Sequence, residues 1–409
     1  MEQENASFTG YQKLVIFLLA ITQFTVILDF MVMSPMGDIL MKSLSIEPKQ
    51  FGFAVSAYAF SAGISGLLTA GFADKFDRKK LLLFFYIGFI VGTIFCGLAQ
   101  SYVALITARI ITGLFGGVIG SISMAIISDL FSLKKRGRVM GFVQMAFGAS
   151  QVLGVPIGLY IANVWDWEAP FLMVAGLAVI IAIIITLKMR PVADHLKIQT
   201  DKSSILHLWH TLSKSEYRIG FATTALLSIG GFMMMPFGSV FAVNNLKITQ
   251  EQLPILFMIS GLSTLIILPL IGKLSDRVSK FKIFLFSSIW LMTICVVYTN
   301  LGQTAFWLVV IFNIFMMIGI VSRMVPSSAL TSAIPNMEDR GAFMSINSSL
   351  QQIAGGIAAS VAGFIVVQKT KFSPLEHYDR VAYVIVVISI LSLFLMYHVD
   401  RYVTKKTAA

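Results

Sequence analysis

Two oppositely charged residues lie deep inside apolar stretches of this 409-residue chain. Asp29, in TQFTVILDFMVMSP, is the one acid well inside an apolar run, and Arg109 lies in LITARIITGLFGG. A charged side chain in hydrocarbon costs roughly 2.5–3.5 kcal/mol on translocon scales, so Arg109 should face a partner or a wet cavity. Asp29 is its natural partner. The two residues could form a structural ion pair, or Asp29 could be a carboxyl group that takes up and releases protons beside Arg109.

Charges also gather in two loops that share one pattern. AGFADKFDRKK begins at Ala70 and IGKLSDRVSK at Ile271, which places Asp74 and Asp276 202 residues apart. KRGRVMGFV matches DRGAFMSIN at a spacing of 204 residues, so the two halves of the chain read as internal repeats. An Asp at a helix end can accept hydrogen bonds from the N-terminus of a neighbouring helix and so latch two bundles together. Alternatively, these charges only set the topology of a solvated loop.

Other polar side chains lie within apolar runs and are candidates for a substrate cavity: Gln23, Gln144, Gln151, Asn313, Asn347 and Gln351. Gln144 and Gln151 are seven residues apart and Asn347 and Gln351 four apart, so each pair shares one helical face. Hydrogen bonds that stabilise the bundle would explain them equally well. Arg323, in GIVSRMVPSS, could bind an anionic substrate group or the cytoplasmic gate, or extend to lipid headgroups.

The composition indicates which elements position these residues. The chain is 57% hydrophobic and 12% charged, whereas a soluble domain is about a quarter charged. A helix needs about 20 apolar residues to cross a membrane, and the strict alternation of barrel strands is absent from these runs. Twelve runs qualify, at approximately 14–40, 51–72, 81–100, 102–128, 139–163, 169–187, 219–243, 253–272, 282–300, 304–332, 342–367 and 381–398. The sequence predicts an all-α integral membrane protein with twelve transmembrane helices.

The longest connection divides the twelve runs into six and six. We expect an N-terminal bundle at 1–188, a linker at 189–217, and a C-terminal bundle with a cytoplasmic tail at 218–409. The linker contains SSILHLWHTLSKSEYR, whose apolar spacing predicts an amphipathic helix on the membrane surface. His207 and His210 could bind a metal or form a solvated pair, and no third ligand is evident nearby. Cys96 and Cys295 each lie inside an apolar run, so the sequence supports no disulfide or metal site.

The distribution of cations predicts the orientation. With both termini in the cytoplasm, twenty-three of the 31 lysines and arginines fall on the cytoplasmic face, six on the other face and two within the membrane. The net charge of +11 therefore reflects orientation and attraction to anionic headgroups rather than nucleic-acid binding. No H-E-x-x-H, G-x-S-x-G or G-x-x-x-x-G-K-[ST] motif occurs, so we expect neither an enzyme nor a cofactor.

The paired loops resemble the signature G-x-L-a-D-[RK]-x-G-R-[RK] of the major facilitator superfamily, although Asp77 and Ser279 stand where that family usually has Gly. The resemblance implies two pseudo-symmetric six-helix bundles, with helices one, four, seven and ten around a central cavity. It places Asp74 near the start of the eleventh run and pairs Arg78 with Asp129. The gate residues that it implies are Asp74, Lys75, Arg78 and Asp129 in the first half, and Asp276, Arg277 and Lys280 in the second.

Two further motifs resemble the drug/proton and sugar-efflux branches. Arg109 and Gly113 match the R-x-x-x-G signature of proton-coupled members, and GASQVLGVPIGLYIA resembles the antiporter signature of the fifth helix. Gly148, Gly154, Pro156 and Gly158 should permit close packing and a bend, which ordinary tight packing would also explain. Val155 separates Gly154 from Pro156, and this spacing looks more like the sugar-efflux branch.

These patterns together predict a secondary transporter that exports small amphipathic or drug-like molecules by alternating access. We expect Asp29 and Arg109 to couple export to protons, with the proton gradient as energy source. A sugar or metabolite exporter, a proton-linked importer and a non-transporting sensor are the alternatives. The expected setting is a monomer that crosses the bacterial plasma membrane many times, and the expected partners are its small-molecule substrate, protons and lipid.

Overall fold

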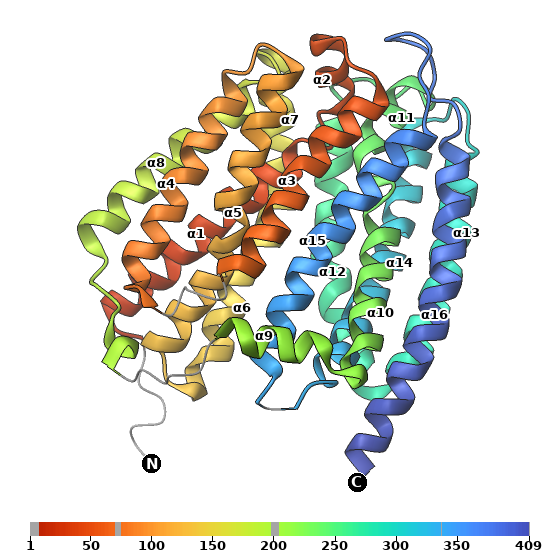
Figure 1. Ribbon diagram of the computed structural model, residues 1–409. Helices are drawn as coiled ribbons and strands as arrows, with labels where there is room; N and C mark the ends of the chain where they lie inside the picture. Colours follow the sequence, from red (N-terminus) through yellow and green to blue (C-terminus); the bar gives the residue numbers. More distant parts are fainter. Residues whose placement is uncertain (1–7, 70–74, 198–203, 337, 409) are drawn as a thin grey trace.

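The computed structural model describes residues 8–69, 75–197, 204–336 and 338–408, nearly all of them helical (Figure 1). The first half contains α1 (Gly10–Val32), α2 (Gly37–Leu44), α3 (Pro48–Thr69), α4 (Arg78–Gly97), α5 (Tyr102–Leu130), α6 (Leu133–Ala149), η2 (Ser150–Gly154), α7 (Val155–Val164) and α8 (Ala169–Lys188). The linker carries η3 (Asp194–Lys197) and α9 (Ser204–Ser213). The second half contains α10 (Ser215–Phe232), η4 (Met235–Phe237), α11 (Gly238–Asn244), α12 (Leu253–Arg277), α13 (Lys280–Thr299), α14 (Phe306–Ser332), α15 (Arg340–Ile365) and α16 (Tyr378–Ala408).

Twelve of these segments cross the membrane. Within the described residues, eleven are long and apolar enough by composition alone, and α6–α7 and α10–α11 each count as one of them. The twelfth is α15, whose 26 residues extend about 39 Å at 1.5 Å per residue. It is less apolar because small and polar residues face its neighbour α3. The expectation of an all-α protein with twelve transmembrane helices in two bundles is confirmed.

The two halves repeat each other in detail. Helices α4 and α13 both have 20 residues, and they begin at Arg78 and Lys280, 202 positions apart. Asp77 caps α4 by accepting a hydrogen bond from the Lys80 amide (3.0 Å), and Ser279 takes the same place before α13. Each half also opens with a long helix, a break and a short helix, α1 with α2 and α10 with α11. The residues that replace the usual glycine in the paired loops therefore begin helices.

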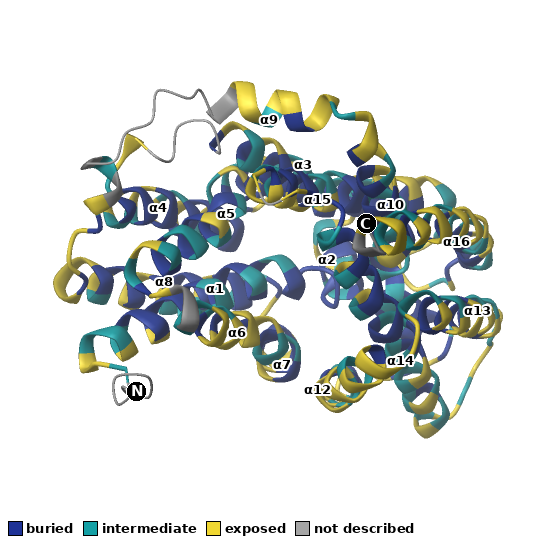
Figure 2. Cartoon of the chain, turned by 90° about the horizontal axis from the view of Figure 1, so that it is seen from below, coloured by how far each residue is buried: buried dark blue, intermediate teal, exposed yellow. Residues whose placement is uncertain are grey.

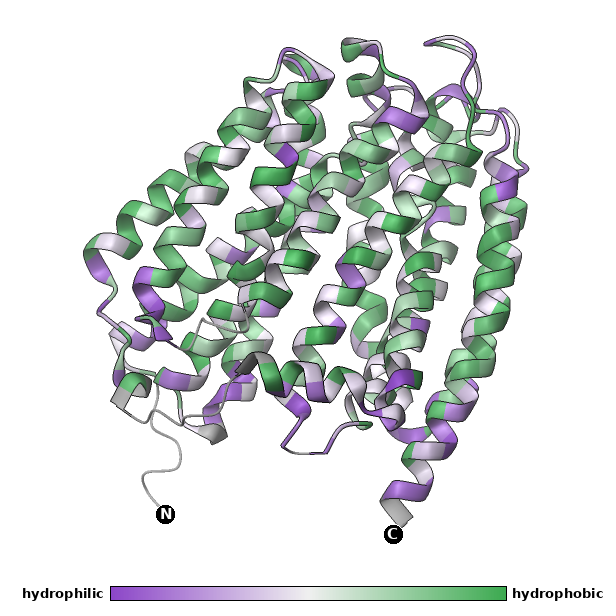
Figure 3. Ribbon diagram, viewed as in Figure 1, coloured by the Kyte–Doolittle hydropathy of each residue, from purple (hydrophilic) through white to green (hydrophobic). Residues whose placement is uncertain are grey.

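Apolar residues cover the middle of the helices and hydrophilic residues gather at both ends (Figure 3). The start of α1 and the end of α16 lie at one end of the molecule, which we call the terminal end; α2 and α11 lie at the far end (Figure 1). Large apolar side chains such as Phe84, Leu187 and Phe394 are exposed on the outside of the bundles. A belt of this kind suits contact with lipid.

The bundles meet along α3 and α15, where small residues bring two backbones together. A Cβ added to Gly52 would lie 2.7 Å from the Ala359 carbonyl oxygen, and one on Gly63 would lie 2.9 Å from that of Ser349. Ser56 Oγ donates to the Gly356 carbonyl across the seam (2.7 Å). Small residues allow this approach because they remove side-chain bulk between the helices.

The linker helix α9 lies across the terminal end beside α15 and α10 (Figure 2). Leu208 packs onto an apolar cluster of the second bundle, whereas Trp209 is exposed, as an amphipathic surface helix requires. His207 Nε2 lies 3.8 Å from Asp339 Oδ1. Among the described residues no group of three or more His, Cys, Asp or Glu side chains could hold a metal.

Candidate functional site

Asp29 of α1 and Arg109 of α5 form an ion pair inside the first bundle. Arg109 Nη1 lies 2.8 Å from Asp29 Oδ2, and both side chains are 0% exposed. Thr93 of α4 donates to the other carboxylate oxygen at 3.3 Å. Three helices therefore meet at one carboxyl group. The pair lies about 10 Å from the far end of α5, at 1.5 Å per residue, which is halfway between that end and the middle of the helix.

Aromatic rings surround the guanidinium of Arg109. Its Cζ lies 4.5 Å from the centre of the Tyr58 ring and 5.9 Å from that of Phe171, which stabilises the cation by cation–π attraction. Tyr58 also packs on Phe30 (5.3 Å), and Phe30 on Phe232 of the second bundle (6.3 Å). A continuous row of rings therefore joins the ion pair to the opposite bundle.

The pair leaves part of its hydrogen-bonding capacity unused. Arg109 Nε and Nη2 are buried and have no hydrogen-bond partner within the described chain. The carboxylate engages the guanidinium through one nitrogen, not through the two-pronged contact that saturates an arginine–carboxylate pair. Two donor nitrogens of Arg109 are thus not used by Asp29.

Three of the predicted cavity residues keep an acceptor available. Gln23 Oε1, Gln151 Oε1 and Asn347 Oδ1 are buried and accept no hydrogen bond from the described residues. Gln23 and Gln151 lie on neighbouring elements, because Ser150 Oγ donates to the Phe24 carbonyl (3.2 Å). Buried amide oxygens without donors are suited to a ligand that carries hydroxyl or amino groups.

The other predicted cavity residues are exposed or already hydrogen-bonded. Gln144 and Gln351 are exposed, and Asn313 Nδ2 donates to the Val309 carbonyl of its own helix (2.9 Å). Arg323 donates to Ser389 of α16 (3.2 Å) and lies over the Phe284 ring of α13 (5.4 Å). These contacts of Arg323 are thus with residues of the second bundle.

The predicted gate of the first half is partly assembled at the terminal end. Arg78 Nε lies 3.2 Å from Asp129 Oδ2, joining the start of α4 to the end of α5. Lys75 is exposed, and Asp74 lies outside the described residues. Arg136 donates to the carbonyls of Phe131 (2.9 Å) and Ser128 (2.6 Å), so a cation secures the C-terminus of α5.

The matching gate of the second half is not assembled in the same way. Asp276 and Arg277 are exposed at the end of α12, and Lys280 Nζ reaches the Ser275 carbonyl at 3.4 Å. No ion pair joins the three within the region described. The acid that does make contacts here is Asp339, before α15.

Asp339 holds the linker to the second bundle. It accepts hydrogen bonds from Lys214 Nζ (2.6 Å) and from the Tyr217 hydroxyl (2.7 Å). The hydrogen bond from Lys214 is the main cause of the lowered pKa of Asp339. The same hydrogen bond raises the pKa of Lys214. The sequence motif DRGAFMSIN contains this acid, yet nothing in the motif indicates its partners, because they lie more than 100 positions earlier, at the start of α10.

A second cluster, which we did not predict, joins the bundles at the far end. Asp38 of α2 is buried and pairs with Lys42 Nζ (2.7 Å) in the same helix. From the second bundle, Asn244 Nδ2 donates to it at 2.6 Å and Gln250 Nε2 donates as well. Ser239 Oγ donates to the Ser34 carbonyl beside it (3.0 Å). We call Asp38, Asn244 and Gln250 the far-end lock.

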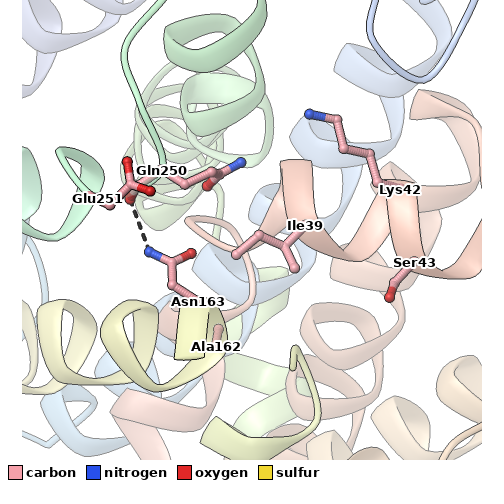
Figure 4. A pocket seen from close by; sticks show the side chains of 7 residues that line it. All are labelled: Ile39, Lys42, Ser43, Ala162, Asn163, Gln250 and Glu251. Atoms are coloured by element: carbon pink, nitrogen blue, oxygen red, sulfur yellow. Dashed lines mark hydrogen bonds between the residues drawn. The ribbon is translucent and has the colours of Figure 1, made fainter. Parts of the chain in front are cut away.

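A pocket of about 520 Å³ borders the far-end lock. Figure 4 shows its lining residues, which come from α2, from α7 and from the turn before α12: Ile39, Lys42, Ser43, Ala162, Asn163, Gln250 and Glu251. Asn163 Nδ2 donates to the Gln250 carbonyl (2.9 Å), a further bond between the bundles.

Comparison with known proteins assigns the family. The sequence profile of the Major Facilitator Superfamily matches residues 19–359 and 220–409. The chain belongs to the Major Facilitator Superfamily. An uncharacterized MFS-type transporter of Bacillus subtilis is 22% identical over 398 residues, covering 94% of this chain and 96% of that protein. A probable sugar efflux transporter of Helicobacter pylori is 25% identical over 156 residues, 38% of this chain and 40% of its own length.

The fold agrees with this assignment. The crystal structure of a D-xylose-proton symporter superimposes with a TM-score of 0.78 at 16% identity, covering 95% of this chain and 98% of that one. The chain is therefore a multi-pass membrane transporter of the superfamily and not an enzyme. The two-bundle architecture described above is the fold of that superfamily.

Besides the contact of α3 with α15, the bundles of this transporter meet along a second seam, between α6–α7 and α12. This second seam is closed mainly toward the far end. Helix α12 packs against η2 and α7 and has few contacts with α6. A Cβ on Gly261 would lie 3.0 Å from the Gln151 carbonyl oxygen, whereas Gly137 and Gly141 of α6 have no neighbour within 4 Å. Helices α6 and α12 thus diverge toward the terminal end, while α3 and α15 stay in contact.

The glycines predicted to pack the fifth helix have close neighbours. A Cβ on Gly154 would lie 2.7 Å from Leu28 of α1, and one on Gly158 would lie 2.6 Å from Val32 of the same helix. A Cβ on Gly148 would lie 2.8 Å from Leu265 of α12. Gly113 of α5 approaches the Tyr58 carbonyl oxygen even more closely by the same measure. Before Pro156 the helix forms the π turn η2, since proline has no amide hydrogen to donate.

Proposed function

We propose that this transporter exports small amphipathic or drug-like molecules in exchange for protons, with Asp29 as the proton carrier and Arg109 as its switchable counter-charge. The observation that carries the proposal is the buried ion pair in which Arg109 keeps two nitrogens without acceptors. Acids within membrane bundles commonly serve as proton sites in pumps and transporters.

The geometry suits a carboxyl group that changes its charge. Protonation of Asp29 would remove the charge that Arg109 neutralises, and an uncompensated buried cation is costly. Arg109 would then draw on its unused nitrogens, on Tyr58, or on a group brought by the substrate. A change at Asp29 would therefore reorganise the contacts of Arg109 rather than leave them in place.

Such a change can reach the interface between the bundles. Arg109 packs on Tyr58, Tyr58 on Phe30, and Phe30 on Phe232 of α10, all by direct ring contact. Packed side chains resist continuous deformation, so a shift at one end favours one of a few discrete arrangements. We infer that protonation biases the choice between closure at the far end and closure at the terminal end.

Closure at the far end and closure at the terminal end would then alternate. The far-end lock closes one end here, and α6 and α12 diverge at the other, so this structure represents an inward-facing arrangement if the terminal end is cytoplasmic. That orientation is supported by the placement of twenty-three of the 31 cations on the predicted cytoplasmic loops. A bacterial plasma membrane is the proposed location.

Export of a sugar or related metabolite is the second candidate. It is favoured by the unbonded amide oxygens of Gln23, Gln151 and Asn347, which can accept hydrogen bonds from hydroxyl groups. The Helicobacter relative is named a probable sugar efflux transporter. An amphipathic compound with one or two polar groups would use the same acceptors.

Everted membrane vesicles test direction and driving ion together. Vesicles with an acidic lumen are offered a panel of fluorescent lipophilic dyes and radiolabelled sugars. We expect accumulation of at least one compound, which collapses when the proton gradient is dissipated. Accumulation that ignores the gradient would contradict proton coupling, and uptake only into right-side-out vesicles would contradict export.

A further inference from the structure

Arg323 is a buried cation, and no described carboxylate lies within ion-pair distance of it. Its side chain lies within the second bundle with only 6% of the residue exposed. The buried or partly buried acids that form ion pairs in this bundle are taken by other cations: Asp339 pairs with Lys214 at 2.6 Å and Glu376 with Lys369 at 2.7 Å. In the first bundle Arg109 has Asp29, but α10, the counterpart of α1, contains no acid after Glu216.

Donor groups around Arg323 lack hydrogen-bond acceptors. Nη1 donates to Ser389 Oγ at 3.2 Å, and Nε is buried without an acceptor. Ser389 is itself 0% exposed and accepts from Arg323, and among the described contacts it donates to no group. Two buried donor groups around this guanidinium, Arg323 Nε of α14 and the Ser389 hydroxyl of α16, therefore lack an acceptor among the described residues.

Other buried serines of the second bundle donate their hydroxyl groups within their own helix, unlike Ser389. Ser392, one turn further along α16, donates to the Ile388 carbonyl (2.7 Å), and Ser288 donates to the Phe284 carbonyl (2.7 Å). Serines that donate to the carbonyl four residues earlier satisfy their hydroxyl groups within the helix. Ser389 has no such bond in the structure, so its hydroxyl remains available to a ligand.

We propose that Arg323 and Ser389 bind a small inorganic anion, such as chloride, inside the second bundle. The missing charge is negative, and the missing groups are acceptors, so a monovalent anion supplies both at once. Phe284 covers the guanidinium and is fully buried, as Ser389 is, so the ligand must be small. The anion would join α14 to α16. This proposal does not depend on the direction of transport or on its driving ion.

Thermal unfolding of the purified transporter in chloride-free buffer tests the site. Chloride is titrated against gluconate at constant ionic strength, and bromide and acetate are titrated in parallel. We expect the Tm of the wild type to rise with chloride and bromide and to saturate. Ser389→Ala should raise the half-saturating concentration by about tenfold to a hundredfold, as loss of a hydrogen bond to a charged group implies.

Ser392→Ala is the matched control, because it removes a buried hydroxyl from the same helix that has its own acceptor; its chloride dependence should equal that of the wild type. Arg323→Gln should abolish the dependence. If that variant does not fold, the two serine variants decide the matter. A wild-type Tm indifferent to chloride, or equal responses in both serine variants, would overturn the proposal. Stabilisation by acetate alone would also overturn it and would indicate the anionic group of a transported compound.

Discussion

The far-end lock offers the most direct perturbation of the balance between the two access states. Asp38→Asn keeps the shape of the side chain and removes the charge that Asn244 and Gln250 share across the seam. A hydrogen bond to a charged group contributes about 1.5–3 kcal/mol, against about 1 kcal/mol for a neutral one. Two weakened bonds should therefore destabilise far-end closure by about 2 kcal/mol, which is roughly a thirtyfold change in the population ratio.

Cysteine labelling can measure this change. Ser239 is 1% exposed at the closed seam, so a Ser239→Cys reporter should react slowly with a membrane-impermeant maleimide. The native Cys96 and Cys295 are buried and can be replaced by alanine in the reporter background. We expect Asp38→Asn to raise the labelling rate by roughly thirtyfold in proportion to the open population.

Lys42→Met is the control for this experiment. It also removes a charged partner of Asp38, but Lys42 belongs to the same helix as Asp38, so both access states lose this ion pair alike. Lys42 Nζ also lies 5.0 Å from the centre of the Phe372 ring of the second bundle, and methionine can keep a contact with that ring. Its labelling rate should stay near that of the wild type. The reasoning is refuted if Asp38→Asn leaves the rate unchanged, or if Lys42→Met raises it as much.

Three further outcomes are expected. Asp29→Asn should lower the free energy of unfolding by about 3–5 kcal/mol because it leaves Arg109 buried without its charge partner. Adding Arg109→Gln should restore most of that loss without restoring proton-coupled transport. Recovery of coupled transport in the double variant would contradict the role of Asp29. Tyr217→Phe should cost about 1.5–3 kcal/mol at neutral pH, measured by denaturation, because it removes a hydrogen bond to ionised Asp339. Since the pKa of Asp339 is lowered in the folded state, this contribution is present above the unfolded pKa of about 3.9 and is lost as the pH falls through the lowered value; a cost that persists unchanged in strong acid would contradict the assignment. Gly52→Ala should lower the free energy of unfolding by about 1–3 kcal/mol, because the added Cβ meets a backbone oxygen that has no alternative rotamer. Gly176→Ala is the control, since a Cβ there has no neighbour within 4 Å. Equal melting temperatures for the two variants would contradict the close packing of α3 on α15.

The sequence is most informative where a residue is chemically out of place. Asp29 and Arg109 are the acid and the base that apolar runs cannot accommodate singly, so their pairing follows from the cost of burying either one. The twelve helices and the repeat follow from run lengths and from loop charges that recur at a nearly fixed spacing. These features need no knowledge of which helix faces which.

The sequence says less where a contact depends on helix rotation or on neutral partners. The far-end lock joins Asp38 to two amides more than 200 positions away, and amides carry no charge pattern that would mark them as partners. Arg323 has a clear depth along α14, but its direction is set by the packing of α13 and α16. Likewise α15 is the least apolar of the twelve spans because small and polar residues line the face that packs on α3.

The central claim, that Asp29 couples transport to protons, is tested most directly by proton movement itself. Purified protein is reconstituted into proteoliposomes that contain a pH-sensitive dye, and a compound identified in the vesicle panel is added on one side without a pre-formed gradient. Wild-type protein should move protons opposite to the compound in a fixed ratio. Asp29→Asn should still bind the compound and exchange it across the membrane, with no proton movement. Proton movement in Asp29→Asn at the wild-type ratio would contradict the account.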